Sequence, residues 1–217
     1  MGVVTVSASF GAGGAEIAPA VAEQLGLPFH DRVIPAQVAG RLGVPVAEAE
    51  ANDETITRGL WRLVSSLGTM PDPVGGVLPT TSLPDERAYR VETERVLGEI
   101  AAGPGGVVLG RAAAMVLRDR PDVLHVRLDG SPERRLAAAV AHLGRPEADV
   151  RRERDAADQA RTAYVRHFYR CDPAEARHYH LVVDSTALPH DTVVDLVVTA
   201  ARAIGIGTGI GTGTGTA

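Results

Sequence analysis

The sequence predicts an α/β fold of three layers, in which a parallel sheet carries helices on both faces. Short apolar, β-branched segments alternate with longer segments of helical periodicity along most of the chain, the order that builds parallel sheets. The first apolar segment runs directly into a glycine-rich turn and an alanine-rich helix. The 217 residues are 45% hydrophobic and 4% aromatic, which is enough for one mainly aliphatic core with insertions.

Residues 3–26 predict a strand, a tight loop and a helix, and the rest of the fold is arranged around them. Gly11, Gly13 and Gly14 allow positive φ angles and keep side chains away from a ligand at the backbone. A helix that begins at once after them would direct its free N–H groups and positive dipole end at that ligand. We therefore expect an anion site, most often a phosphate site, in the loop formed by Gly11, Ala12, Gly13, Gly14, Ala15 and Glu16.

This loop matches two known phosphate-binding patterns imperfectly. The dinucleotide pattern G-x-G-x-x-G fits Gly11 and Gly13 but has Glu16 at its third glycine. The P-loop pattern G-x-x-x-x-G-K-[ST] has Ala8 at its first glycine, Gly14 at its lysine and Ala15 at its hydroxyl residue. A glycine turn that only joins the strand to the helix stays open as the alternative.

The remaining elements follow in order. Residues 26–31 predict a turn and a short buried strand that ends at Asp31; residues 33–40, 46–52 and 53–67 predict helices, and residues 68–83 a long loop. A helix is expected over residues 84–102, strands over 105–110, 124–129 and 179–184, and helices over 111–117, 145–170 and 190–204. Ser131 and Pro132 are the cap and first residue of one further helix.

These elements predict one domain over residues 1–203. Its core comprises about residues 1–30, 104–144 and 178–203, with a helical insert at 31–103 and a charged helical segment at 145–177. Residues 204–217 form a Gly/Thr/Ile tail that we expect to be disordered and to carry no function.

Composition excludes several classes of function. A net charge of −5 argues against a general nucleic-acid binder. The sequence contains no run of about 18 apolar residues, so no membrane span is expected. Its N-terminus lacks a signal-peptide layout, so a cytoplasmic protein is expected. The single cysteine, Cys171, excludes an internal disulfide framework and a multi-cysteine zinc site. All 22 basic residues are arginine, so a cation that binds phosphate must be arginine or a metal.

Polar residues gather where strands end, the edge at which such sheets bind ligands. The glycine-rich loop follows the first strand, Asp31 follows the second and Arg111 follows the strand at 105–110. A charged helix carries Arg154, Asp158 and Arg161 at i, i+4 and i+7, which is one helical face. A solvated helix crossed by salt bridges is the general alternative for such a charge run.

Four segments resemble the cytidylate kinase-like family, relatives of bacterial cytidylate kinase among the P-loop nucleoside monophosphate kinases. Residues 5–31 resemble the family's opening, and residues 108–111 with 121–129 resemble its Gly-Arg segment and the next strand. The Arg-Asp-x-x-Asp-x-x-Arg run at 154–161 resembles the lid motif, and residues 181–186 resemble the last strand. Order and spacing agree over most of residues 3–200, whereas about 40–100 has little to match.

The resemblance implies a three-layer P-loop kinase-like fold with a helical insert and a lid. It implies that Arg111, Arg154 and Arg161 hold the acceptor's monophosphate and stabilise the transferred phosphoryl group, and that Asp158 binds base or sugar. Asp31 would open the acceptor-binding region. The donor would be ATP with Mg²⁺, and residues 145–177 would close over the site.

No residue is assigned as a metal ligand. Asp129 and Asp184, at strand ends, are weaker candidates, because such acids are more often helix caps or structural residues.

The departures from the family pattern concern the donor site. Gly14 replaces the lysine and Ala15 the arginine that usually compensates for it, and Ala157 replaces a lid arginine. One charge about 4 Å from the γ-phosphate contributes roughly 4 kcal/mol, on the order of a thousandfold in rate. Glu16 would repel phosphate unless Mg²⁺ lay between them.

Three functions follow from these observations. The first is ATP-dependent phosphoryl transfer to CMP, dCMP or a related small acceptor. The second is a catalytically silent nucleotide-binding or regulatory protein that keeps the acceptor pocket. The third is a kinase of another small molecule, for which the segment at about 40–100 would set specificity. Small-molecule nucleotides are the expected partners, and the oligomeric state stays open, with a homodimer as one option.

Overall fold

A computed structural model describes residues 2–31, 86–110 and 112–207 of the chain, and it confirms the parallel α/β fold. Five parallel strands form one sheet in the order β2-β3-β1-β4-β5. The strands are β1 (Val3–Ala8), β2 (Phe29–His30), β3 (Gly106–Leu109), β4 (Val123–Asp129) and β5 (Leu181–Asp184). The helices and the loop predicted over residues 33–83 lie outside the described residues.

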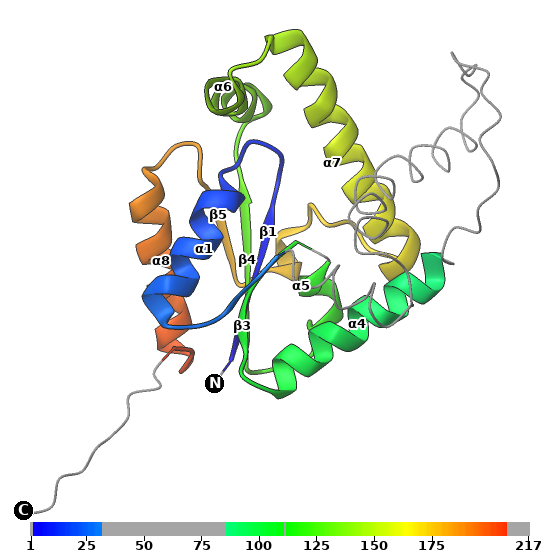
Figure 1. Ribbon diagram of the computed structural model, residues 1–217, viewed down its shortest axis with the longest axis vertical. Helices are drawn as coiled ribbons and strands as arrows, with labels where there is room; N and C mark the ends of the chain where they lie inside the picture. The colour runs from blue at the N-terminus through cyan, green and yellow to red at the C-terminus, as the bar shows by residue number, and fades with distance from the viewer. Residues whose placement is uncertain (1, 32–85, 111, 208–217) are drawn as a thin grey trace, which may run out of the picture.

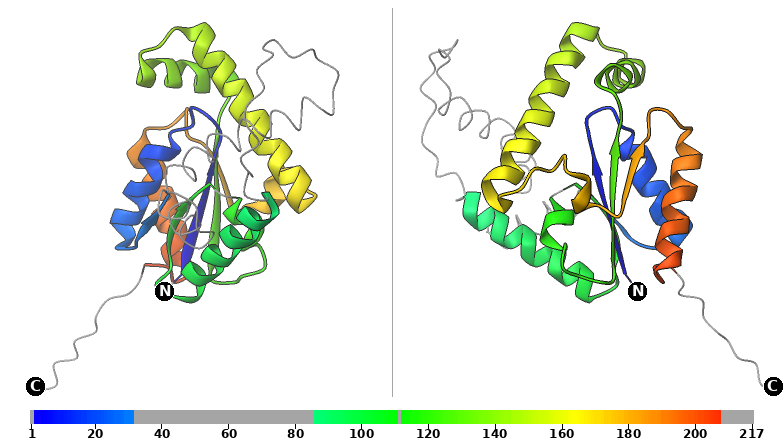
Figure 2. Two further views of the ribbon diagram at one scale, coloured as in Figure 1. Left: turned by 45° about the vertical axis from the view of Figure 1, so that its right-hand side comes forward. Right: turned by 180° about the vertical axis from the view of Figure 1, so that it is seen from behind.

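Two helical layers cover the sheet (Figures 1 and 2). One layer consists of α1 (Gly14–Leu25) and α8 (His190–Ala203), and the other of α4 (Glu86–Ala102) and the short α5 (Ala113–Val116). The remaining helices are α6 (Pro132–Leu143), α7 (Glu147–Tyr169) and a 3₁₀ turn at Ala176–His178. The predicted α/β architecture is therefore present with its three layers.

The central strand β1 pairs with β3 on one edge and with β4 on the other, and the helical layers bury both of its faces. Val4 and Val6 belong to the core cluster that includes Ile17 of α1 and Val197 of α8. Val3, one residue away and on the opposite face, belongs to the cluster under α4 and α5. The alternation of a strand therefore divides one β-branched run between two cores.

Local signals in the sequence set the ends of the helices. The Ser131 hydroxyl accepts a hydrogen bond from the Arg134 backbone N–H at 3.3 Å, and Pro132 is the first residue of α6, as predicted. Glycines with left-handed φ end both α6 and α1: Gly144 has φ 63° and Gly26 has φ 64°. These short-range features explain why α6 begins directly after the carboxyl end of β4.

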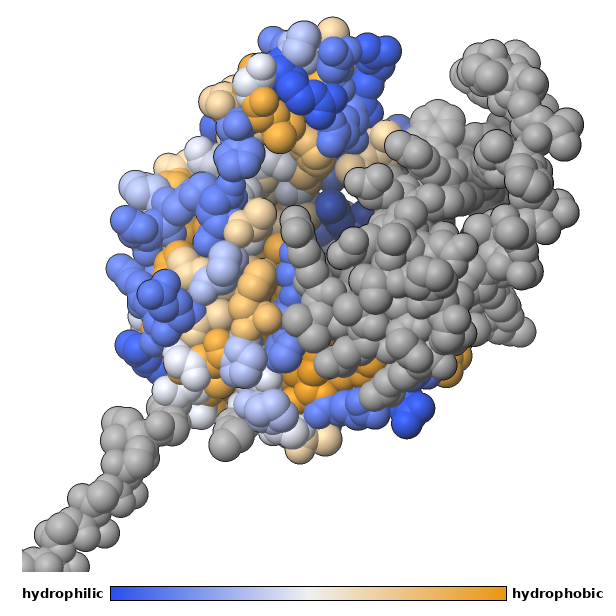
Figure 3. Space-filling view, viewed as in Figure 1, coloured by the Kyte–Doolittle hydropathy of each residue, from blue (hydrophilic) through white to orange (hydrophobic). Residues whose placement is uncertain are grey.

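The α6–α7 hairpin lies beyond the carboxyl ends of the strands, and α7 crosses from α6 to the far end of α4 (Figures 1 and 2). There the hydroxyl of Tyr169, the last residue of α7, donates a hydrogen bond of 3.1 Å to Glu94 of α4. The outer surface of the hairpin is largely hydrophilic (Figure 3), as the charged sequence of α7 requires. The lid proposed at 145–177 contains all of α7.

Two segments differ from the boundaries drawn from the sequence. Helix α4 falls in the range predicted for the insert, but its residues Val96 and Leu97 are buried against the sheet, so it forms part of the core. The tail is expected to be disordered from residue 204, yet Ile206 is buried in the core shared by α1 and α8. Its N–H donates to the Ala201 carbonyl at 2.9 Å, which ends α8. Residues 208–217 lie outside the described part.

None of the helices in the described ranges is both long and apolar enough to cross a membrane.

Candidate functional site

The glycine-rich loop between β1 and α1 is held tightly by its neighbours. Gly11 and Gly13 have left-handed φ angles of 77° and 71°. A Cβ atom at residue 11 would overlap the Arg135 carbonyl oxygen of α6, and one at residue 13 would lie 2.7 Å from His190 Nε2. Both glycines are therefore favoured by conformation, and at residue 11 the α6 backbone also leaves no space for a Cβ. Ser185 adds a further anchor, since its hydroxyl donates to the Ala12 carbonyl at 2.8 Å.

The loop leaves the positive end of α1 without a side-chain cap. Gly13 is the N-cap residue and makes no side-chain hydrogen bond to the helix. Ala15 and Glu16 are exposed, and the Glu16 carboxylate lies 3.3 Å from His142 Nδ1 on α6. Free N–H groups and the helix dipole at such an end favour an anion.

A cavity of about 350 Å³ opens at the carboxyl ends of β1 and β4, below α7. Its charged lining residues are joined to one another by ion pairs and its apolar ones gather in a packed cluster, and we call these two groups its charged end and its apolar end. The charged end is lined by Arg127, Asp129, Arg135, Asp158 and Arg161. The apolar end is lined by Ala112, Met115, Ala160, Tyr164 and Val165. Ser9 also lines the cavity, but the six residues of the predicted phosphate loop do not. The cavity therefore lies next to the loop, at Ser9, and does not include the loop's six residues.

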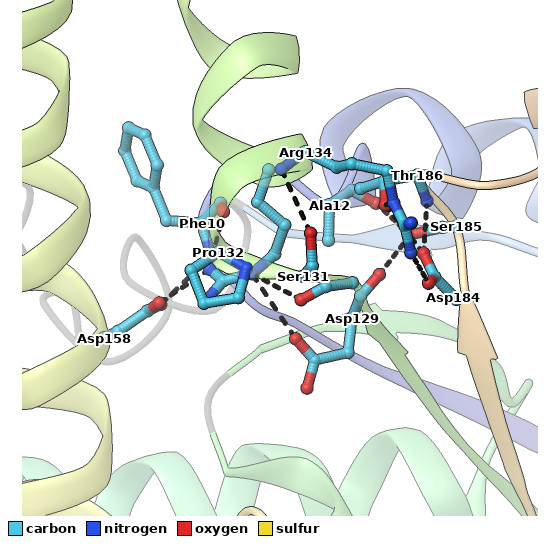
Figure 4. Close-up of polar contacts among 12 residues, drawn as sticks. Phe10, Ala12, Asp129, Ser131, Pro132, Arg134, Asp158, Asp184, Ser185 and Thr186 are labelled. Atoms are coloured by element: carbon cyan, nitrogen blue, oxygen red, sulfur yellow. Dashed lines mark hydrogen bonds and ion pairs between the residues drawn. The ribbon is translucent and has the colours of Figure 1, made fainter.

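Asp158 lies at the junction between the cavity and the loop. Its Oδ1 accepts a hydrogen bond of 3.1 Å from the Phe10 N–H (Figure 4) and one of 3.0 Å from Arg161. Its Oδ2 accepts one of 2.7 Å from Arg135, whose same nitrogen also donates to the Phe10 carbonyl at 2.9 Å. The backbone of Phe10, the residue directly before Gly11 of the loop, is thus bonded to both an acid of α7 and an arginine of α6.

A second ion pair forms the floor of the charged end. Arg127 donates to Asp129 Oδ2 at 3.1 and 2.6 Å, and it also donates to the Pro173 carbonyl. Arg135 Nε lies 3.5 Å from Asp129 Oδ1. Burial raises the pKa of Asp129, but the hydrogen bond and charge of Arg127, with hydrogen bonds from Ser9 and the Gly130 backbone, together outweigh it, so the pKa lies below its ordinary value. Asp129 is thus an ionised partner for two guanidinium groups.

Arg161 is the most open of the described cations that line the cavity, since 44% of its side chain is exposed. Among the described residues, Asp158 is the acceptor that its guanidinium contacts. Burial lowers the pKa of the Arg161 guanidinium below its ordinary value, and the like charges of Arg127 and Arg135 lower it further. The charge and hydrogen bond of Asp158 offset only part of this lowering of the pKa. A cation with unused donors near two like charges is suited to bind an anion.

The structure separates the site residues predicted from the sequence. Asp158 and Arg161 line the cavity, as their shared helical face predicted. Arg154 does not: it is buried, donating to the Pro132 carbonyl of α6 at 2.8 Å and to Asp155 at 2.9 Å. In this structure the Arg154 side chain therefore fastens α6 and does not reach the cavity. Asp31 follows β2 and is not among the cavity's lining residues, and Arg111 lies outside the described residues.

Arg127 and Arg135 also line the cavity, although no sequence motif predicted a role for them there. A signal for Arg127 was available, since His125, Arg127 and Asp129 alternate along β4 and give one polar face at its carboxyl end. Arg135 carried no comparable signal, because packing of α6 over the loop decides its position.

The two weaker metal candidates are both engaged by arginine. Asp129 pairs with Arg127, and Asp184 pairs with Arg134 and with the Thr186 hydroxyl (Figure 4). Within the described ranges, no group of three or more His, Cys, Asp or Glu side chains is arranged to hold a metal ion.

Comparison with solved structures supports the fold. A protein of Eubacterium ventriosum has a TM-score of 0.64 at 14% identity, over 94% of this chain and 99% of that one. A gluconokinase from Sinorhizobium meliloti has a TM-score of 0.50 at 16% identity, over 94% of this chain and 93% of that one. At these identities the likeness concerns the fold, which is that of the P-loop kinases.

Sequence comparison gives one partial relative and one family. Over 143 residues the chain is 28% identical to a uronate isomerase of Corynebacterium glutamicum, which is 65% of this chain but 27% of that protein. The chain thus spans about a quarter of that relative's length. The cytidylate kinase-like family matches residues 3–187, which include the glycine-rich loop, the cavity and the α6–α7 hairpin. Because this match covers most of the chain, the protein belongs to the cytidylate kinase-like family.

Proposed function

We propose that this protein transfers a phosphoryl group from ATP to a nucleoside monophosphate of the CMP or dCMP type, or to a related small acceptor. The observation that carries the proposal is the direct contact between the cavity's charged end and the loop, since Asp158 and Arg135 both bond to Phe10. An acceptor in the cavity would lie beside a donor whose phosphates the loop holds. Phosphoryl transfer requires chiefly such positioning, together with charge stabilisation.

The cavity supports an acceptor with one charged and one apolar part. Arg161 would bind the acceptor's phosphate as a charge-assisted fork, and Arg127 and Arg135 would hold the surrounding acids in place. The apolar end near Met115 and Tyr164 would receive the base or the sugar. Asp158 would accept a hydrogen bond from the base or sugar.

Arg111 and Asp31 are proposed acceptor-binding residues by family membership. Arg154, which fastens α6, is no longer assigned to catalysis.

On the donor side, the backbone of residues 11–16 at the start of α1 would hold the ATP phosphates. Mg²⁺ would enter as part of the substrate Mg-ATP, with water and phosphate as most of its ligands. Asp129 and Asp184 are both ion-paired, so these acids do not fit a protein-held magnesium site. Charge stabilisation at the transferred group would come from guanidinium groups, of which Arg161 is the most accessible in the described cavity.

A specific observation favours a second function, that of a catalytically silent nucleotide-binding or regulatory protein. The loop has no cationic side chain of its own, because Gly14 and Ala15 occupy the positions where relatives carry lysine or arginine. Gly11 and Gly13 are also enclosed by α6 and His190. A protein of this kind would keep the acceptor cavity and bind ATP weakly.

Coupled detection of ADP with Mg-ATP and a panel of nucleoside monophosphates and small hydroxyl acceptors tests the first function. We expect ADP formation above the acceptor-free background with CMP or dCMP. No turnover with any acceptor, combined with calorimetric binding of CMP and none of ATP, would establish the second function instead. Absence of both turnover and nucleotide binding would contradict both.

A further inference from the structure

We propose that Asp158 is an exchangeable internal anion: its carboxylate occupies a phosphate position, and an incoming phosphate replaces it there. This inference rests on the proposed function, because the phosphate would belong to the acceptor. The position is formed by the Phe10 N–H, Arg135 and Arg161 and lies between the cavity and the glycine-rich loop.

The donors around Asp158 match those that bind phosphate in proteins. They are two guanidinium groups and a backbone N–H at the start of a glycine-rich turn, with hydrogen bonds of 2.7, 3.0 and 3.1 Å. They come from α6, α7 and the β1–α1 loop, so three separate parts of the fold converge on one anion. An ordinary surface ion pair within α7 would involve only Asp158 and Arg161, without the hydrogen bonds from Phe10 and Arg135.

The surroundings allow the carboxylate to leave. The Asp158 side chain is 28% exposed and lines the cavity, so that it can turn toward water or an acceptor hydroxyl. Arg135 would still contact Asp129 and still donate to the carbonyls of Gly130 and Phe10. Exchange of one anion for another therefore leaves no buried guanidinium without a partner.

The exchange would couple acceptor binding to the contact between the loop and α7. While Asp158 holds the Phe10 N–H, a hydrogen bond ties α7 to the loop. When phosphate takes the position, that hydrogen bond passes to the ligand, and the released carboxylate becomes available to the acceptor's sugar or base. The acceptor itself would thus change the link between the two halves of the active site.

Calorimetry with inorganic phosphate tests the exchange directly. In Asp158→Asn the competing charge is gone, and we expect phosphate to bind at least about tenfold tighter than in the unmodified protein. Asp155→Asn is the matched control on the same helix, since Asp155 pairs with Arg154 outside the cavity and should leave phosphate affinity unchanged. Adding Arg161→Gln to Asp158→Asn should abolish the gain.

A second measurement uses the unmodified protein. In a ¹⁵N-resolved NMR titration with phosphate, the Phe10 amide signal should shift and saturate, because its hydrogen-bond acceptor changes. An unmoved Phe10 signal, or Asp158→Asn phosphate affinity no higher than that of Asp155→Asn, overturns the exchange; if the variant does not fold, the titration decides alone. Both measurements omit ATP, so a lack of kinase activity would refute the proposed function without deciding the exchange.

Discussion

Gly11 in the β1–α1 loop lies directly against the backbone carbonyl of Arg135 in α6, close enough that a Cβ at residue 11 would overlap that oxygen. The contact joins residues that are far apart in the chain, and it places α6 over the loop. It explains why the loop keeps glycine at a position where the P-loop pattern allows any residue.

Substitution Gly11→Ala should therefore destabilise the protein by more than backbone strain alone. A left-handed φ costs an alanine about 1–2 kcal/mol, and overlap with the α6 backbone adds to it. Gly26→Ala is the control, since Gly26 has φ 64° but a Cβ added there would have no neighbouring atom within 4 Å. Chemical denaturation should give a clearly larger loss of unfolding free energy for Gly11→Ala. Equal losses would mean that α6 does not press on the loop.

Arg154 should act on stability and leave acceptor affinity almost unchanged. Arg154→Met removes its hydrogen bond to the Pro132 carbonyl and should lower the unfolding free energy by about 1–3 kcal/mol. Arg152→Met, on the same helix but 78% exposed, should change it by less than about 0.5 kcal/mol. The dissociation constant for CMP should change less than about twofold in either variant. A large rise in the CMP dissociation constant of Arg154→Met, with an unchanged free energy of unfolding, would instead place Arg154 in the acceptor site.

Stability should fall as the pH drops from about 6.5 to 4, and His125 is one cause. Burial lowers the pKa of His125 to about 4, and the charge of neighbouring His180 contributes to the lowering. Its Nδ1 shares a buried 2.8 Å hydrogen bond with Thr5 Oγ1 in the adjacent strand. Between about pH 6.5 and 4 the unfolded chain binds a proton that the folded protein does not, so acidification favours unfolding.

Across this pH range His125 lowers the free energy of unfolding by roughly 3 kcal/mol. Above about pH 6.5 it has no such effect, because its imidazole is neutral in both the folded and the unfolded chain. Thermal unfolding of His125→Leu across that range should show a shallower loss of stability than the unmodified protein. His142→Asn, at an exposed histidine of α6, should keep the original slope. An unchanged slope in His125→Leu would show that His125 titrates normally.

The fold could be predicted because its signals are local. The β-branched run of β1, the glycines after it and the Ser131–Pro132 start of α6 each determine their own element within a few residues. The sheet then follows, since strands that alternate with helices pair in parallel. The helix at α4 was predicted within two residues, but its packing in the core and the burial of Ile206 could not be predicted, because both depend on which distant surface remains to be covered.

The site could be predicted only in part for the same reason. Helical spacing correctly brought Asp158 and Arg161 to one face, but spacing says nothing about where a long arginine side chain ends. Arg154 reaches α6 instead of the cavity. Arg135 enters the site through a contact with Phe10, 125 residues away, that no local pattern encodes.

We propose that the cavity positions a nucleoside monophosphate for phosphoryl transfer, with the Arg161 guanidinium on its phosphate. The most direct measurement is CDP formation from CMP and Mg-ATP by the unmodified protein, Arg161→Gln and the surface control Arg152→Gln. We expect CDP from the unmodified protein and the control, and a kcat/KM for CMP at least about a hundredfold lower in Arg161→Gln. No CDP from the unmodified protein, or equal kcat/KM in all three, would contradict the claim.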